Sequence, residues 1–149
     1  MSDYMVLAYE MEYKNPVSER SVVELIPYTS EFKDKYKVMY NECYREMRGA
    51  LDIKPYDYIQ DDSFFDSGMD RVYLLINKGE IIGSVTLKTE EIDDLIVNRK
   101  YQGQGYGKQI LLWALEHMDS ERIVLHVADW NKRAIALYKK TGFEITGEA

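Results

Sequence analysis

The sequence is poor in several residue types that mark particular kinds of protein. Its one cysteine, Cys43, cannot form a disulfide within the chain. Because the chain has only two histidines besides this cysteine, a dedicated zinc site is not expected. No apolar run approaches the roughly 18 residues that a membrane-spanning helix needs, and no signal-type hydrophobic region is present. We therefore expect a cytoplasmic protein without a bound metal or a membrane partner.

Positive charge is also scarce. Lysine and arginine total 19 against 26 aspartates and glutamates, so the formal net charge is −7 at pH 7. An acidic surface repels nucleic acids and anionic membranes at long range, so neither is an expected partner. A cationic partner is favoured instead.

Hydrophobic and aromatic residues, by contrast, are plentiful. They make up 46% and 13% of the 149 residues, with thirteen tyrosines among them. This hydrophobic content is enough for one substantial core, and a chain of this length is too short for two domains. Without a Pro/Gly/Ser-rich linker or an internal repeat, we expect a single domain over residues 1–149.

Hydrophobic periodicity predicts strands and helices in alternation along the chain. Residues 6–14 and 22–28 have the pattern of strands, and Ser30 is placed to cap a helix that ends near Gly49. Cys43 lies on the apolar face of that helix and is expected to be an ordinary core residue. Residues 54–70 show no clear period and form either a short helix or a mobile lid. The later elements are a hairpin over 72–88, a strand over 91–97, a helix ending near 119, a strand over 122–129, a helix over 131–142 and a strand over 143–146.

Two features of the second half concern the geometry of the sheet. The step from Ile92 to Leu95 breaks strict alternation, which indicates a β-bulge. The chain order of strand, Gly-rich turn, helix and further strand predicts a right-handed parallel βαβ unit. We therefore expect an α+β (mixed α/β) domain, with a mostly antiparallel twisted sheet, a central parallel βαβ unit and helices on both faces.

The turn of that βαβ unit, QGQGYGK over residues 102–108, holds three glycines. A Gly-rich turn at a helix N-terminus presents backbone N–H groups and the positive helix dipole to one point, which suits a phosphate. Lys108 can add charge there. The dinucleotide fingerprint and the nucleoside-triphosphate loop both need other spacings, and tight packing remains an alternative reason for the glycines.

With its flanks, this segment resembles the GNAT superfamily of acetyl-CoA-dependent N-acetyltransferases. Gln102, Gly105 and Gly107 match the superfamily's pyrophosphate motif. A second matching block begins at Val127 and runs through Asn131, Ala134, Tyr138, Gly142 and Phe143.

The resemblance implies acetyl-CoA as cosubstrate, no metal, and direct transfer without a covalent enzyme intermediate. Asn131 matches a residue that contacts the pantetheine arm, although it can also serve simply as a helix cap. Tyr138 matches the usual general acid, and the structural alternative for it is a core aromatic residue. The implied cofactor-binding backbone is Leu95, Ile96 and Val97 for the pantetheine arm, and Gln102, Gly103, Gln104, Gly105, Tyr106, Gly107 and Lys108 for the pyrophosphate.

The general base stays open among several groups. Glu91 lies eleven residues before Gln102, where some family members carry a catalytic glutamate. Asp93 shares its face in a regular strand, although a bulge can bring in Asp94 instead, and many family members use a chain of waters. His126 is expected to be a satisfied core histidine, and His117 to favour a helix C-terminus.

By family analogy the acceptor pocket is built from the first helix and residues 54–70. Aspartates and aromatic rings together suit a cation, which predicts a small-molecule or peptide primary amine as acceptor. A solvated acidic loop is the alternative. The residues concerned are Asp57, Asp61, Asp62, Asp66 and Asp70, with Tyr56, Tyr58, Phe64 and Phe65.

One departure from the family concerns the sheet. Family members have two strands after the Gly-Phe pair, but only one follows Phe143 here. Residues 1–20 supply an extra N-terminal strand segment instead. We expect residues 6–14 to fill the missing position beside the strand from Phe143, either in the same chain or by exchange within a homodimer. A non-catalytic acyl-CoA-binding module and an interaction protein that keeps the fold are the competing functions.

Overall fold

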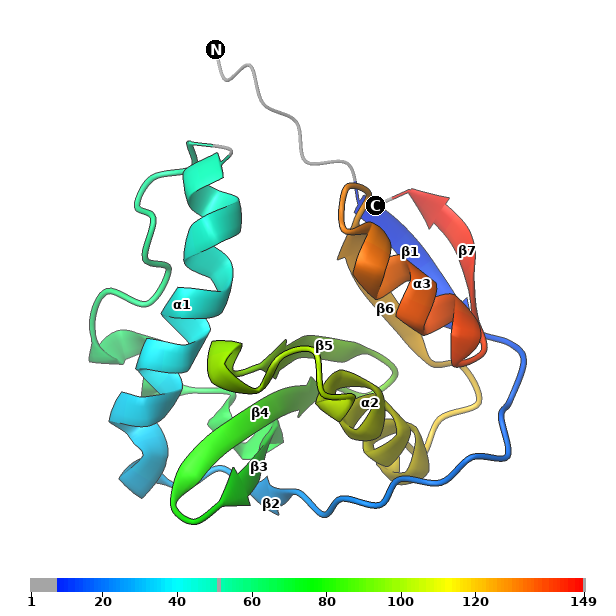
Figure 1. Cartoon of the computed structure of the whole chain (residues 1–149), viewed down its shortest axis with the longest axis horizontal. Coiled ribbons are helices and arrows are strands. Elements are labelled where there is room, and N and C mark those ends of the chain that lie inside the picture. The colour runs from blue at the N-terminus through cyan, green and yellow to red at the C-terminus, as the bar shows by residue number, and fades with distance from the viewer. Residues whose placement is uncertain (1–7, 51, 149) are drawn as a thin grey trace.

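The computed structural model describes residues 8–50 and 52–148 and arranges them as two β-sheets that meet along one edge (Figure 1). All strand neighbours within each sheet are antiparallel. One sheet has the order β2 (Ile26–Pro27), β3 (Val72–Asn77), β4 (Glu80–Leu87) and β5 (Ile92–Val97), and the other has the order β6 (Val124–Ala128), β1 (Ala8–Tyr13) and β7 (Phe143–Glu148).

The two sheets are joined where β5 and β6 begin. Glu91 and Val124 form an isolated parallel bridge, and the N–H of Val124 donates to the carbonyl of Glu90 over 2.8 Å. Beyond this bridge no further pairing joins β5 to β6 within the described residues. The predicted parallel βαβ unit is therefore present, but its two strands part almost at once.

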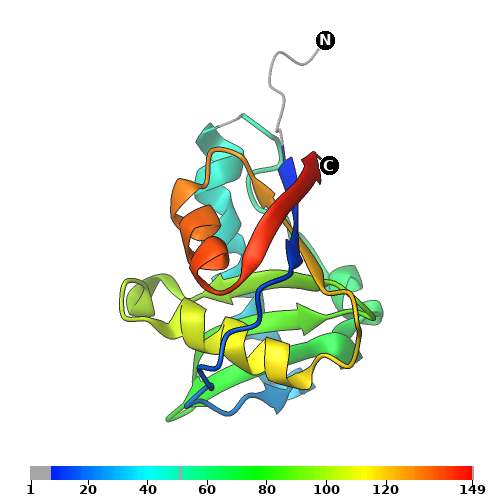
Figure 2. The ribbon, with the colours of Figure 1, turned by 90° about the vertical axis from the view of Figure 1, so that its right-hand side faces the viewer.

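Among the described residues, three α-helices cover the sheets: α1 (Lys33–Ala50), α2 (Tyr106–His117) and α3 (Lys132–Lys140). Ile110 of α2 and Ile135 of α3 belong to one hydrophobic cluster, whereas Tyr36 and Tyr40 of α1 belong to a second. β4 supplies Val85 to the first cluster and Ile81 to the second, so α1 packs on the opposite face of the sheet from α2. Figure 2 shows α2 lying across its face of the sheet. The expected α+β class with helices on both faces is confirmed.

β1 lies between β6 and β7 and pairs with both within its own chain. Met11 is opposite Ile145 on one side and Leu125 on the other, and its side chain is completely buried. The N-terminal strand thus fills the position beside β7 that the sequence leaves vacant. Residues 6 and 7 of the predicted strand lie outside the described residues.

The strand predicted over residues 22–28 is wrong for most of its length. Only Ile26 and Pro27 pair with β3, and Val22 is 84% exposed. The N–H groups of Ser21 and Val22 donate to side chains of α2 instead, which ties this segment to the helix rather than to the sheet.

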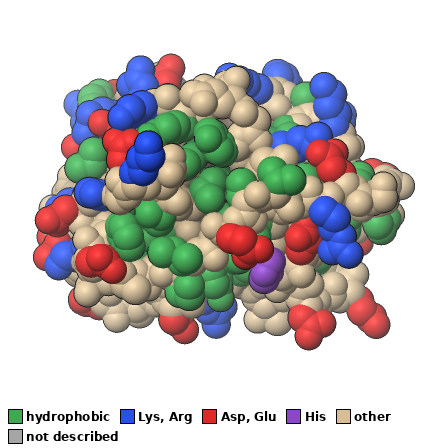
Figure 3. All heavy atoms as spheres, turned by 60° about the horizontal axis from the view of Figure 1, so that its bottom comes forward, with side chains coloured by type: hydrophobic (Ala, Val, Ile, Leu, Met, Phe, Trp, Pro, Cys, Tyr) green, Lys and Arg blue, Asp and Glu red, His purple; other side chains and the backbone are tan. Residues whose placement is uncertain are grey.

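The surface on this side carries scattered hydrophobic residues. Figure 3, in which the bottom of Figure 1 comes forward, shows hydrophobic side chains in the middle of the face among charged ones. Ile26 and Val22 are exposed and contribute apolar surface from the segment before α1. Over residues 8–50 and 52–148, no helix combines the length and apolar composition that a membrane crossing requires.

Gly142 makes the close approach of the N-terminal segment possible. Its φ is +110°, and a Cβ there would lie 2.2 Å from the carbonyl oxygen of Asn15. The Gly142 carbonyl in turn accepts N–H groups of Lys14 and Asn15, each over 3.0 Å. Both the backbone conformation and the available space therefore require glycine.

Replacing Gly142 with alanine should lower the free energy of unfolding by about 2 kcal/mol or more, because positive-φ strain adds to a backbone clash. Chemical denaturation measures the loss. Gly68→Ala is the matched control, since Gly68 has φ +81° but open space around the added methyl. Equal losses in the two variants would contradict the proposed contact with Asn15.

Candidate active site

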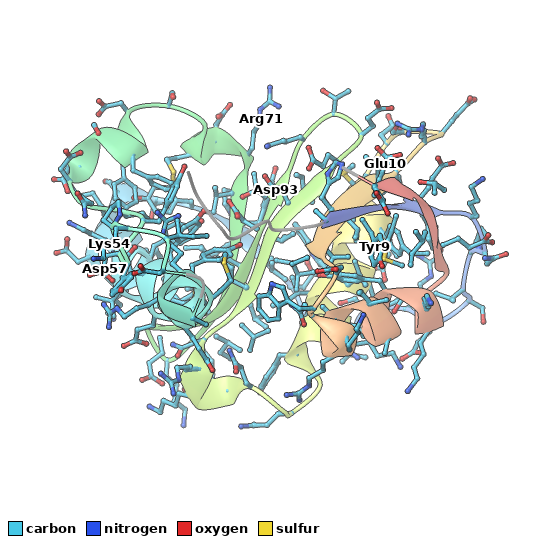
Figure 4. All side chains as sticks on the ribbon, turned by 90° about the horizontal axis from the view of Figure 1, so that it is seen from above. Tyr9, Glu10, Lys54, Asp57, Arg71 and Asp93 are labelled. Carbon is cyan, nitrogen blue, oxygen red and sulfur yellow. The ribbon has the colours of Figure 1, made fainter. Side chains whose placement is uncertain are left out.

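A cavity of about 380 Å³ opens where β5 and β6 part. Its walls come from β5, β6, the C-terminal half of α1, and the N-cap and last turn of α3. Seen from above, Asp93 of β5 lies between α1 and the β6–β1–β7 sheet (Figure 4). The cavity therefore runs between the two sheets, and residues from both of its sides can meet in it.

The Gly-rich loop lies between β5 and α2. Gly103 and Gly105 have φ values of +79° and +88°, so both adopt a backbone conformation that disfavours side chains. In the part of the chain that the structure describes, the backbone N–H groups of residues 103–108 donate to no protein acceptor. With the positive end of α2, this loop can bind an anionic group such as a phosphate.

Gln102 and Cys43 hold the loop and α1 against the end of β5. The Gln102 side-chain amide donates to the carbonyl of Val97 over 3.0 Å, and the Cys43 thiol donates to the same oxygen over 3.3 Å. Burial raises the pKa of the Cys43 thiol to about 11, so it is protonated at neutral pH. Leu95 and Ile96 also line the cavity, which lies beside the strand edge that β6 leaves free.

Lys108 does not direct its charge to the loop, contrary to the sequence-based expectation. Its ammonium pairs with Glu19 over 2.9 Å, because the segment before β2 runs along that side of α2. A cation that does lie beside the loop is Arg133 in the first turn of α3, whose guanidinium is 3.7 Å from the position a Gly103 Cβ would take. Nothing in the local sequence marks Arg133, since its approach to the loop depends on how α3 packs.

α3 contributes the two residues that the second motif singles out. The Asn131 side chain accepts the N–H of Ala134 over 3.2 Å and so caps the helix, while Asn131 also lines the cavity. Tyr138 lines the cavity. Its ring packs against that of Phe143, at a centroid distance of 6.1 Å. Burial raises the pKa of the Tyr138 phenol to about 12, which keeps it protonated at neutral pH.

The predicted bulge occurs in β5 and changes which carboxylates reach the cavity. The register with β4 shifts between Ser84 and Thr86, and Asp94 has φ +45°. Asp93 and Asp94 both line the cavity. The side-chain order of a regular strand would have sent them to opposite faces.

These neighbouring carboxylates have different partners. Asp93 accepts from the ammonium of Lys88 over 2.8 Å, whereas Asp94 accepts from the hydroxyl of Tyr44 over 2.9 Å and from that of Tyr40 over 3.3 Å. Burial, and next the charge of Asp93, raise the pKa of Asp94, and the two tyrosine hydrogen bonds partly oppose the rise. Asp94 is half-buried, and hydroxyl donors rather than a cation hold its carboxyl group at the cavity.

His126 differs from the core histidine that the sequence suggested. Its side chain is 39% exposed and lines the cavity, because alternation along β6 turns it away from the buried Leu125 and Val127. Its Nδ1 lies 3.0 Å from a carboxylate oxygen of Glu91. Glu91 itself does not line the cavity, so its route to the site passes through His126.

The segment expected to form the acceptor pocket lies elsewhere. No residue from 54 to 70 lines the cavity, and Figure 4 shows Lys54 and Asp57 on the far side of α1 from Asp93. Phe64 and Phe65 pack against Tyr36, which fixes the segment on the outer side of the helix. Three of its five aspartates have partners nearby: Asp57 pairs with Arg45, Asp62 pairs with Lys33, and Asp61 accepts the N–H of Ser63.

The environment of Asp94 predicts a pH-dependent gain in stability for Asp94→Asn. A carboxyl whose pKa is raised by folding destabilises the native state as pH rises from its unfolded pKa through its folded pKa. The variant's stability relative to wild type should therefore increase between about pH 4 and pH 7. Urea unfolding at both pH values measures this, with the exposed Asp66→Asn as control. A pH-independent difference would rule out the electrostatic origin.

Known proteins share parts of this chain. Over 61 residues it is 34% identical to the spermine/spermidine N(1)-acetyltransferase of Bacillus subtilis (strain 168), covering 38% of this chain and 40% of that protein. Over 73 residues it is 32% identical to the peptidyl-lysine N-acetyltransferase YjaB of Salmonella typhimurium, covering 49% of each. The chain thus spans half or less of these relatives' length.

Solved structures share the fold over more of the chain. The apo-form of YjaB from Escherichia coli superposes with a TM-score of 0.66 at 19% identity, covering 85% of each chain. A GNAT-family acetyltransferase from Colwellia psychrerythraea superposes with a TM-score of 0.74 at 12% identity, covering 97% of this chain and 54% of that one. Residues 36–143, well over half of the chain, match the acetyltransferase (GNAT) family. The protein therefore belongs to the GNAT family of acetyltransferases.

Proposed function

We propose that this protein transfers an acetyl group from acetyl-CoA to the primary amine of a cationic acceptor, by direct attack of the amine. The observation that carries the proposal is the cavity between β5 and β6. It has an anion-binding loop nearby, a protonated phenol on one wall and two carboxylates on another. Acetyl-CoA, when bound, supplies a phosphate-bearing handle and a thioester that an amine can attack.

The residues around the Gly-rich loop fit the phosphates of acetyl-CoA. The unpaired N–H groups of residues 103–108 can donate to phosphate oxygens, and glycine at 103 and 105 leaves room for a bulky anion. Arg133 supplies the nearby positive charge. Asn131 and the free edge of β5 at Leu95 to Val97 then lie along the path from the loop into the cavity and can hold the pantetheine arm.

The carboxylates at the cavity favour a cationic acceptor. Asp94 is half-buried and accepts hydrogen bonds from two tyrosine hydroxyls, and Asp93 adds a second carboxyl group next to it. An ammonium group approaching Asp94 would gain a charge-assisted hydrogen bond. The B. subtilis and S. typhimurium relatives are named for acetyl transfer to spermine or spermidine and to peptidyl-lysine, which also carry primary amines. We therefore propose polyamines and lysine side chains as the acceptor classes to test.

Tyr138 is the proposed general acid. Its hydroxyl is protonated at neutral pH and its side chain lines the cavity, so it can give a proton to the departing sulfur. Asp93 on β5 is a candidate for removing the proton from the amine, and Glu91, just before β5, can act through a group that it orients.

The test is thiol release from acetyl-CoA with a panel of primary amines that includes spermidine and a lysine peptide. Wild type should turn over at least one of them. Tyr138→Phe should lower kcat at least about tenfold with unchanged acetyl-CoA affinity. Tyr56→Phe, an exposed tyrosine outside the cavity, is the matched control. Tight acetyl-CoA binding without turnover of any amine would favour a non-catalytic binding module instead.

Arg133→Ala should weaken acetyl-CoA binding about tenfold, because an arginine–phosphate contact is charge-assisted. Isothermal titration calorimetry measures the affinity. Lys139→Ala removes a positive charge from the other end of the same helix and should change the affinity little. An equal loss in both variants would assign the effect to net charge rather than to contact with the phosphates.

A further inference from the structure

His126 and Glu91 form a hydrogen-bonded pair whose ring orientation is set from two sides. The Nδ1 of His126 lies 3.0 Å from Glu91 and its Nε2 lies 3.7 Å from Glu10, which is directly opposite on β1. Arg122 in turn binds Glu10 over 3.0 Å and also contacts Glu12 and Glu90. The charged groups around the imidazole thus come from β1, from the turn before β5 and from the residues just before β6.

The pair lies at the point where the two sheets separate. Val124 forms the bridge to Glu91, and His126 follows it on the same face because side chains alternate along a strand. His126 is therefore the first side chain on that face beyond the bridge. It lines the same cavity as Asp94 and Tyr138.

The other candidate bases are already engaged. Asp93 is bonded to Lys88, and Asp94 to two tyrosine hydroxyls. Glu91 is bonded to His126 and lies outside the cavity wall. A proton on Nδ1 of His126 that is donated to Glu91 leaves the Nε2 lone pair free to accept a proton.

We propose that Nε2 of His126 accepts the proton of the acceptor's ammonium group, with Glu91 as the residue that positions the ring. This inference rests on the proposed acetyl transfer. The neutral amine then forms the C–N bond as the C–S bond of the acetyl thioester breaks. Tyr138 gives its proton to the sulfur and regains one from the nitrogen, and His126 releases its proton to water. Glu10 stabilises the imidazolium in the interval.

The test compares His126→Gln with wild type on two acceptors, an alkyl primary amine and a hydrazine that is already neutral at the assay pH. With the alkyl amine kcat should fall about a hundredfold. With the hydrazine the loss should nearly vanish, since no proton has to be removed first. Acetyl-CoA affinity should stay unchanged. His117→Gln, on α2 and hydrogen-bonded to the carbonyl of Trp113, is the matched control.

Glu91→Gln tests the positioning role with a readout besides activity. Nitrogen NMR should show the Nδ1-protonated neutral tautomer of His126 in wild type and its loss in this variant, together with about a tenfold fall in kcat. If His126→Gln lowered kcat equally on both acceptors, or on neither, the inference would be overturned while the proposed acetyl transfer would stand. Absence of wild-type turnover with every amine would overturn both.

Discussion

The site depends on one constraint of the sheet: β5 and β6 are joined by a single parallel bridge and then separate. Continued pairing would have used the facing backbone groups of both strands and closed the space between them. Because the strands part, one edge of β5 is left for a ligand to pair with. Side chains from α1 on one face and α3 on the other also reach the same cavity. Divergence thus brings together groups that an unbroken sheet would separate.

The bulge at Asp94 brings a second carboxyl group to the cavity at a cost to stability. It turns two successive carboxylates toward the cavity, where burial and mutual repulsion make ionisation of Asp94 unfavourable. Tyr40 and Tyr44 offset part of this by donating hydroxyl groups to it. Unfavourable local conformation and charge of this kind are common at active sites, where the surrounding structure holds them in place. The remainder of α1 is packed on a dense aromatic cluster that can maintain this arrangement.

Local patterns predicted the elements of the second half well, including the hairpin, the bulge and both helices, because periodicity and turn residues act over a few positions. They failed where a distant segment decides. Val22 is exposed because α2 binds its backbone, and Lys108 turns to Glu19. His126 reads as a core residue in an apolar strand, yet the separation of the sheets exposes it. Phe64 and Phe65 looked like an acceptor pocket but fill the packing around α1.

The location of β1 sets an order on folding. Met11 pairs with Leu125 and Ile145. Forming the sheet that carries His126 therefore closes a chain loop of more than a hundred residues between β1 and its two neighbours. Such closure costs chain entropy before any contact compensates for it, and contacts this far apart in sequence slow folding. During synthesis, the β2–β5 sheet can assemble on α1 while β1 still waits for its neighbours. The sheet that bears the imidazole is complete only when β1 lies between β6 and β7.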